Sequence, residues 1–122
     1  MKKKKHIQMT KYTYSALLNQ YDEDVPVATV KEDVPATMTA SYIKQAPGIY
    51  QLRITQNDED ILTNCLPFIN QGWCGVNVRL STRPLDLGVY IHVEKWNGTD
   101  YIAMDGEMPA NTSFKVDFWI EE

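Results

Sequence analysis

The feature that most constrains this chain is an alternation of apolar and polar residues with a period of two, which recurs from one end to the other. Successive side chains of a β-strand point to opposite faces, so this pattern predicts strands with one buried face and one polar face. The clearest case lies near the C-terminus. There Phe114, Val116, Phe118 and Ile120 are expected to face the core, and Lys115, Asp117, Trp119 and Glu121 the opposite side.

The same alternation predicts about eight short strands, and no stretch of convincing length has the periodicity of an amphipathic helix. Turn-forming residues separate the segments. Many short strands at this spacing are typical of an all-β fold, and we expect an antiparallel β-sandwich of jelly-roll or immunoglobulin-like type. The remaining predicted strands cover residues 11–18, 25–30, 37–43, 49–55, 76–81, 89–94 and 101–104.

The sequence makes specific predictions for two of the segments between these strands. Asn97-Gly98 readily supplies the two positive φ values of a type I′ turn, so it predicts a hairpin that leads into Tyr101. The stretch 57–75 is the least regular, and Asp58 is placed to cap a single helical turn there. Its apolar content, which includes Phe68, indicates that this loop packs against the sandwich or against a neighbouring subunit.

The 122 residues fit one compact domain, which we expect over residues 11–122, after a flexible basic arm over residues 1–10. The arm contains Lys2, Lys3, Lys4 and Lys5. Without these four, 8 of the 12 basic residues remain against 16 acidic ones, so the body has a formal charge of −8. Such a body repels nucleic-acid phosphates, although the arm alone could contact an acidic surface.

The sequence also indicates the cellular compartment in which the protein is expected to be made. No apolar segment of signal-peptide length follows the lysines, and no run of 18 apolar residues occurs, so we expect neither secretion nor a membrane span and expect synthesis in a cytosol. In that compartment Cys65 and Cys74 are expected to be free, buried thiols. A disulfide that closes the loop between them is the alternative.

Catalytic residue sets are missing from the sequence. The only histidines are His6, in the arm, and His92, on the polar side of a strand pattern, where a surface position is expected. No phosphate-binding glycine loop, dinucleotide fingerprint or zinc-spaced Cys/His set occurs. The acidic clusters 22–24 and 58–60 lack EF-hand spacing and are interpreted as solvated turns. We therefore expect a protein that is not an enzyme and needs no cofactor or metal.

Three tryptophans are the stronger candidates for a functional surface. Trp119 falls on the polar phase of its strand, Trp96 lies beside the predicted hairpin turn, and Trp73 lies in the irregular stretch. Exposed aromatic rings stack on sugars or become buried in protein interfaces. Partial burial under a neighbouring loop is the structural alternative.

Segments in both halves of the sequence resemble structural proteins of tailed bacteriophages. Residues 11–20 (Lys-Tyr-Thr-Tyr-Ser-Ala-Leu-Leu-Asn-Gln), 25–30 (Val-Pro-Val-Ala-Thr-Val) and 48–52 (Gly-Ile-Tyr-Gln-Leu) are similar to a recurrent β module of these proteins. Residues 88–91 and 109–116 resemble the ends of phage fibre and decoration proteins.

The resemblance implies a virion structural protein: a capsid decoration, head-fibre or tail-associated subunit that forms homo-oligomers and binds other capsid or tail proteins. The candidate contacts are Trp73, Trp96, Trp119, Phe68 and the four lysines of the arm. No membrane and no sequence-specific nucleic acid is expected as a partner. The alternative is a carbohydrate-binding or adhesin module that uses its exposed tryptophans.

Overall fold

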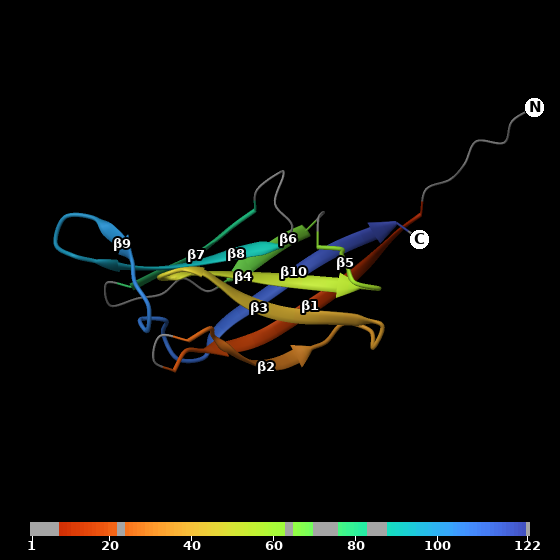
Figure 1. The fold of residues 1–122 in the computed structure, drawn as a ribbon, viewed down its shortest axis with the longest axis horizontal. Coiled ribbons are helices and arrows are strands. Elements are labelled where there is room, and N and C mark those ends of the chain that lie inside the picture. The colour runs from red at the N-terminus through yellow and green to blue at the C-terminus, as the bar shows by residue number, and fades with distance from the viewer. Residues whose placement is uncertain (1–7, 22–23, 63–64, 70–75, 83–87, 122) are drawn as a thin grey trace, which may run out of the picture.

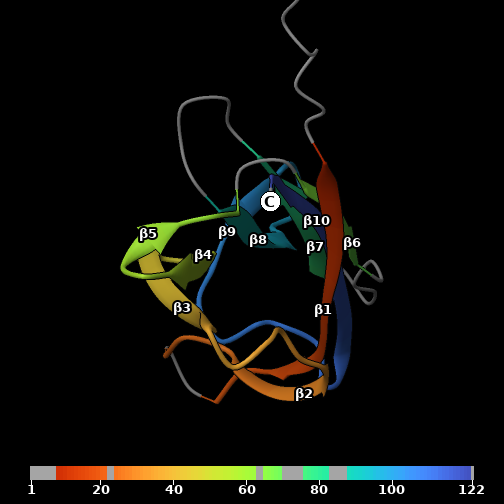
Figure 2. The ribbon, with the colours of Figure 1, turned by 90° about the vertical axis from the view of Figure 1, so that its right-hand side faces the viewer.

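The computed structural model describes residues 8–21, 24–62, 65–69, 76–82 and 88–121. These residues form ten β-strands and no helix, arranged as two antiparallel sheets that face each other in a β-sandwich (Figures 1 and 2). The all-β prediction from the period-two pattern is therefore confirmed.

The first sheet, sheet A, has the order β2 (Val27–Glu32), β1 (Met9–Asn19), β10 (Thr112–Glu121), β6 (Cys65–Ile69). Sheet B has the order β3 (Met38–Ala46), β4 (Ile49–Gln56), β8 (Val89–Trp96), β7 (Val76–Ser81). Two short strands extend sheet B: β5 (Glu59–Asp60) pairs with β4, and β9 (Tyr101–Ala103) pairs with β8.

The core lies between the sheets and is filled by the alternating side chains that the sequence indicates. Phe114, Val116 and Phe118 of β10 are each at most 1% exposed. Across from them, Val89, Ile91 and Val93 of β8 are fully buried. The hydroxyls of Tyr14 in β1 and Tyr42 in β3 share a hydrogen bond of 3.0 Å, which links the two sheets. Burial of these apolar faces is the main driving force for the fold.

The first and last long strands of the chain are neighbours at the centre of sheet A. β1 and β10 pair over ten positions, from Met9 opposite Glu121 to Leu18 opposite Thr112. β1 therefore begins at Met9 and includes two residues that the sequence analysis assigned to the arm. The two termini of the described chain lie at the same end of the sandwich (Figure 1).

The stretch after β4 differs from the prediction. Asn57 and Asp58 have φ values of 53° and 62°, and Gln56 pairs with Glu59 across them, so they form a two-residue hairpin turn. The helical turn expected at Asp58 is wrong, because asparagine and aspartate accept the left-handed conformation that such a turn requires. Further on, residues expected in a loop form β6 on the edge of sheet A.

The opposite end of the sandwich is closed by a turn between β3 and β4. Gly48 has a φ of 72°, and its carbonyl accepts a hydrogen bond of 2.8 Å from the Val93 N–H of β8. A Cβ at this position would lie 2.7 Å from the Val93 carbonyl oxygen. Only glycine fits this close approach of two backbones.

Candidate functional site

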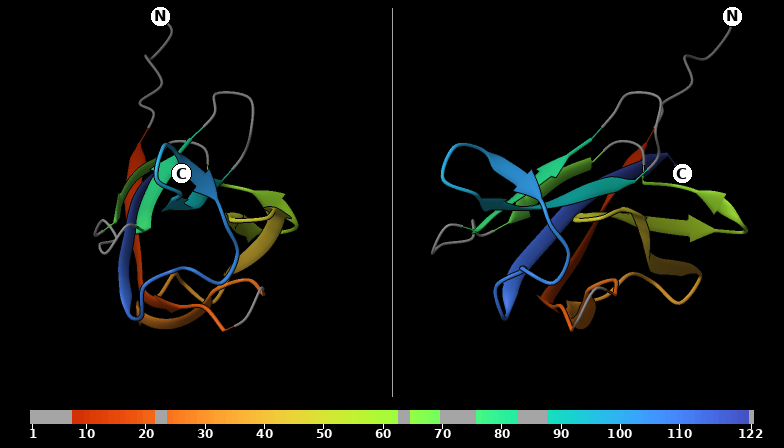
Figure 3. Two further views of the ribbon diagram at one scale, coloured as in Figure 1. Left: turned by 90° about the vertical axis from the view of Figure 1, so that its left-hand side faces the viewer. Right: turned by 60° about the vertical axis from the view of Figure 1, so that its left-hand side comes forward.

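The most prominent exposed apolar surface is the hairpin of β8 and β9, which projects at one end of the sandwich (Figure 3). Trp96 pairs with Tyr101, so residues 97–100 form a four-residue loop. The predicted hairpin is confirmed, but its turn is not the two-residue type I′ turn that Asn97-Gly98 indicated. Instead the Asn97 side chain accepts 2.8 Å hydrogen bonds from the backbone N–H groups of Thr99 and Asp100, which fixes the longer loop.

Three large apolar side chains lie at this hairpin and are called the hairpin tip: Trp96 (47% exposed) and Tyr101 (48%) opposite each other on one face, and Ile102 (40%) on the other face. The rings of Trp96 and Tyr101 meet edge to face, with centroids 5.3 Å apart. All three residues of β9 are exposed, because no described strand covers either face of the hairpin there. Lack of alternation in a strand this short explains why sequence analysis did not select Tyr101 and Ile102.

The base of the hairpin is fixed by ion pairs. Lys95 Nζ lies 3.2 Å from a carboxylate oxygen of Glu107, and Arg79 Nε of β7 lies 2.6 Å from Glu94 Oε1. Both pairs are exposed enough for solvent to weaken them, so each contributes modestly. These pairs link the hairpin to β7 and to the segment before β10, and the ring contact joins its two strands.

A second apolar surface lies on the outer face of sheet A. The side chains of β6 alternate, with Cys65 and Ile69 packed against the core and Leu66 and Phe68 exposed on the outside by 51% and 46%. Pro67 lies between them, and a proline has no N–H for the ladder, which is compatible with an edge strand. Phe68 is thus an exposed residue of a strand, rather than part of a packed loop.

Charged groups lie beside these apolar residues. Asp117 of β10 is 7% exposed although its pattern predicted an outward position. Its carboxylate accepts a 2.7 Å hydrogen bond from Thr13 Oγ1 and lies 3.8 Å from the ammonium groups of both Lys11 and Lys115. Burial of the charge is tolerated because it is paired and hydrogen-bonded.

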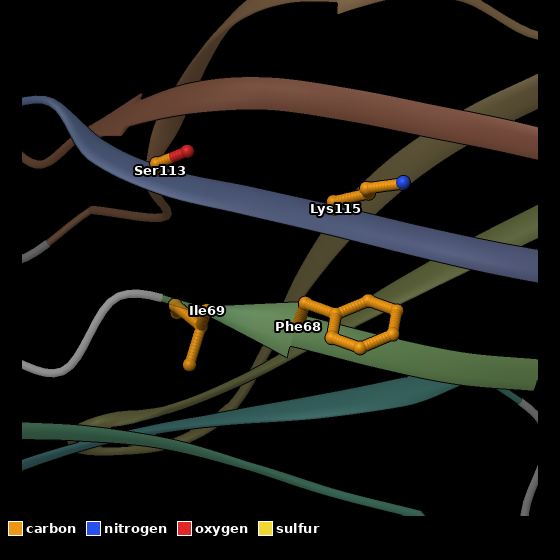
Figure 4. A pocket seen from close by; sticks show the side chains of 4 residues that line it. All are labelled: Phe68, Ile69, Ser113 and Lys115. Carbon is orange, nitrogen blue, oxygen red and sulfur yellow. The ribbon is translucent and has the colours of Figure 1, made fainter.

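A shallow hollow of about 390 Å³ opens on this face beside β6. Figure 4 shows its lining, with Phe68 and Ile69 on β6 and Ser113 and Lys115 on the adjacent β10. Lys115 Nζ lies 5.8 Å from the centroid of the Phe68 ring, within the range of a cation–π contact. The described residues that line the hollow supply apolar side chains, one hydroxyl and one ammonium group, and they include no catalytic set.

Asp105 organises the end of the sandwich below the hairpin. Its Oδ1 accepts 2.7 Å hydrogen bonds from the Gly48 N–H and the Tyr50 hydroxyl, and its Oδ2 lies 2.8 Å from Lys44 Nζ. Gln20, from the β1–β2 connection, donates to the Tyr50 hydroxyl. The network therefore links the β1–β2, β3–β4 and β9–β10 connections around the Asp105 carboxylate.

These contacts perturb two pKa values in opposite directions. Burial alone would raise the pKa of Asp105, but hydrogen bonds from Lys44, Gly48 and Tyr50 outweigh it and hold the pKa below the ordinary 3.8. Burial, reinforced by the hydrogen bond to the Asp105 carboxylate, raises the pKa of Tyr50 to about 12. The ionised carboxylate and neutral phenol are the forms that stabilise the fold.

The outer face of sheet B contains polar side chains that are unexpectedly buried. His92 is 7% exposed, so the expected surface position is wrong, and its Nε2 is 2.7 Å from Ser81 Oγ on β7. Beside it on β4, Gln51 is 1% exposed and accepts a 2.6 Å hydrogen bond from Gln45. Ser81 was not among the partners expected for His92, for which only a cysteine was considered. The pairing of β7 with β8 brings the Ser81 hydroxyl to the imidazole.

The predicted contact residues do not gather at one place. Trp96 ends β8 at the projecting hairpin, whereas Trp119 lies near the C-terminal end of β10, opposite Lys11, and is half-buried. In Figure 1 the β9 hairpin and the C-terminus lie at opposite ends of the sandwich. The structure therefore does not bring these two rings together. Trp73 and the four lysines Lys2, Lys3, Lys4 and Lys5 lie outside the described residues.

Other expectations concern thiols, metals and membranes. Cys65 is a free, half-buried thiol, and Cys74 lies outside the described residues. Within the described ranges, no group of three or more His, Cys, Asp or Glu side chains is arranged to hold a metal ion. The same ranges contain no helix that could cross a lipid bilayer.

Comparison of the chain with protein-family models, curated proteins and solved structures found no match.

Proposed function

We propose that this protein is a structural subunit that functions by protein–protein assembly, and that the assembly is a phage virion. The observation that carries the proposal is the hairpin tip, where three large apolar side chains are 40–48% exposed on a projecting hairpin. Exposed apolar groups of this size, and aromatic rings above all, are typical of interaction sites. The virion as the setting depends on the resemblance of residues 11–55 to phage structural proteins.

The contacts within the hairpin support a binding role over simple exposure. The Trp96 and Tyr101 rings contact each other, and Asn97 accepts hydrogen bonds that define the loop, so part of the bound arrangement exists before a partner arrives. Such pre-organisation lowers the entropic cost of association. The basic arm supplies a second contact of different character, since four lysines attract an acidic capsid or tail surface over a distance that salt shortens.

The proposal is tested by co-assembly. The chain is co-expressed with the capsid, portal or tail proteins encoded by neighbouring genes, and particles are separated by gradient sedimentation. Wild type is expected to co-sediment with particles, and Trp96→Ser with Tyr101→Ser is expected to reduce the bound fraction at least about tenfold, as removal of central aromatic contacts does.

The matched control is Ile43→Ser, which removes a 37%-exposed apolar side chain from the outside of β3 on sheet B. It should co-sediment like wild type. A wild-type chain that never accompanies particles, or neighbouring genes without any virion component, would contradict the proposal.

The alternative function is glycan binding. The edge-to-face pair of Trp96 and Tyr101 favours it, because an exposed indole offers a flat apolar face to a sugar ring. A glycan array decides between the two: binding that is lost in Trp96→Ala supports a carbohydrate-binding module, and absence of binding counts against it.

A further inference from the structure

We propose that the outer face of sheet A is the surface through which two copies of this chain associate. The face consists of the outward side chains of β1, β10 and β6. The inference rests on the proposed function, in which subunits act by assembly, and adds the surface and the partner. It uses a part of the molecule separate from the hairpin tip.

The face carries apolar side chains on the adjacent strands β6 and β10. Strand register places Leu66 and Phe68 of β6 beside Asp117 and Lys115, and Trp119 lies one pleat further along β10. Leu66 and Phe68 are about half exposed. In Figure 2 none of the described strands is packed on the outward side of β1, β10 and β6. Such apolar exposure on a sheet face is typical of a site that another molecule covers.

Charge favours a second copy as that molecule. The body of the protein has a formal charge of −8, so two copies repel each other in most orientations. The charged residues at the outward positions of β1 and β10 are Lys11, Lys115, Asp117 and Glu121, two of each sign. The face itself is therefore neutral, so two copies that meet there experience less repulsion than in other orientations, and Asp117 is already paired within its own chain.

The size of the face fits a small dimer interface. β1, β10 and β6 have 11, 10 and 5 residues, and about 3.3 Å per residue with about 4.8 Å between strands gives a flat area of about 400 Å². A standard interface buries roughly 800 Å² of accessible surface per partner, and side-chain relief makes the accessible area larger than the flat one. The face therefore fits a weak dimer whose population depends on protein concentration.

The hollow beside Phe68 suits a dimer with two-fold symmetry. Phe68 is exposed at one side of a hollow that Ser113 and Lys115 line (Figure 4). In an isologous dimer each surface element contacts its counterpart reciprocally. Phe68 of each copy would enter the hollow of the other, where it gains apolar contacts and keeps a lysine within cation–π range.

The test is sedimentation equilibrium of the full-length chain with two face variants. Phe68→Glu places a carboxylate opposite Lys115, and Leu66→Lys places an ammonium opposite Asp117, so each new charge has a partner within the monomer. Wild type is expected to dimerise, and each variant to raise the dimer dissociation constant at least about tenfold. Ile43→Glu and Trp96→Ser, outside the face, should leave it unchanged, and circular dichroism checks that all variants are folded.

Ionic strength gives a second readout that identifies the occupant. Salt screens the repulsion between acidic bodies, so a dimer through the neutral face should tighten as sodium chloride rises. Docking of the arm Lys2–Lys5 on an acidic surface of another copy would weaken instead, and would be lost when these lysines are replaced by serine. That result overturns the inference, as does a wild type that stays monomeric or a dimer that Phe68→Glu leaves intact.

The outcomes separate this inference from the proposed function. A Phe68→Glu monomer that still co-sediments with particles leaves the proposed function standing and supports the dimer face. A wild-type dimer that Phe68→Glu disrupts, with no affinity for virion proteins, supports the face and contradicts the virion role.

Discussion

At the residue scale, Asp105 joins several connections at one end of the sandwich. Its carboxylate receives the Gly48 N–H, the Tyr50 hydroxyl and the Lys44 ammonium. Asp105→Asn removes the charge and turns one acceptor into a donor, so it should lower the free energy of unfolding by about 1–3 kcal/mol near neutral pH.

The loss should depend on pH. Because the pKa of Asp105 is lower in the folded state, its stabilisation is present above 3.8 and disappears as pH falls through the folded pKa. Urea unfolding at about pH 6 and about pH 2.5 should therefore show a stability gap between wild type and Asp105→Asn that narrows in acid. Asp100→Asn, at the exposed hairpin loop, is the control and should show no gap. An undiminished gap in acid would exclude the charge as the cause.

Tyr50 gives the corresponding prediction in alkali. Its folded pKa of about 12 exceeds the ordinary 10.0, so the neutral phenol stabilises the protein fully below 10 and loses this effect as pH rises through 12. Tyr50→Phe removes this ionisable group and should make the alkaline loss of stability less steep, at a cost in stability at neutral pH. The fall should not vanish, because burial also raises the pKa of Tyr14 and Tyr42. Spectrophotometric titration at the phenolate band checks it. Titration of all tyrosines near 10 would contradict the prediction.

At the element scale, the β4–β5 turn shows how local sequence sets strand pairing. Asn57 and Asp58 both have positive φ, which β-branched residues avoid most strongly. The melting temperature of Asp58→Gly should be at or above that of wild type, followed by Asp58→Ala and then Asp58→Val. The free energies of unfolding of Asp58→Gly and Asp58→Val should differ by at least about 1 kcal/mol. Equal melting temperatures for Asp58→Gly and Asp58→Val would be incompatible with this turn.

At the scale of the whole molecule, stability and association are linked. A domain of this size has a large surface for its volume, and binding that is specific to the folded state stabilises it by mass action. If sheet A associates as proposed, the melting temperature of wild type should rise with protein concentration, whereas that of Phe68→Glu should not. Differential scanning calorimetry over a hundredfold range of concentration measures this. A wild-type melting temperature independent of concentration would separate folding from assembly.

The sequence by itself determined the strands and the buried faces, because period-two alternation is a local consequence of the extended backbone. The alternation in β10, β8 and β7 located the core residues of those strands correctly. It failed where exposure depends on distant neighbours. Asp117 and His92 lie on the polar phase but are buried, and β6 was hidden in an irregular apolar stretch.

Only the tertiary structure decided which strands pair and which surfaces remain uncovered. Ladder hydrogen bonds use backbone groups that every residue carries, so the sequence contains little information on the choice of β10 as the neighbour of β1. That choice brings Thr13 to Asp117 across 104 residues and leaves Leu66 and Phe68 on an outer face. Tryptophans selected for their chemistry were likewise placed by topology, with Trp96 on a projecting hairpin and Trp119 half-buried near the other end.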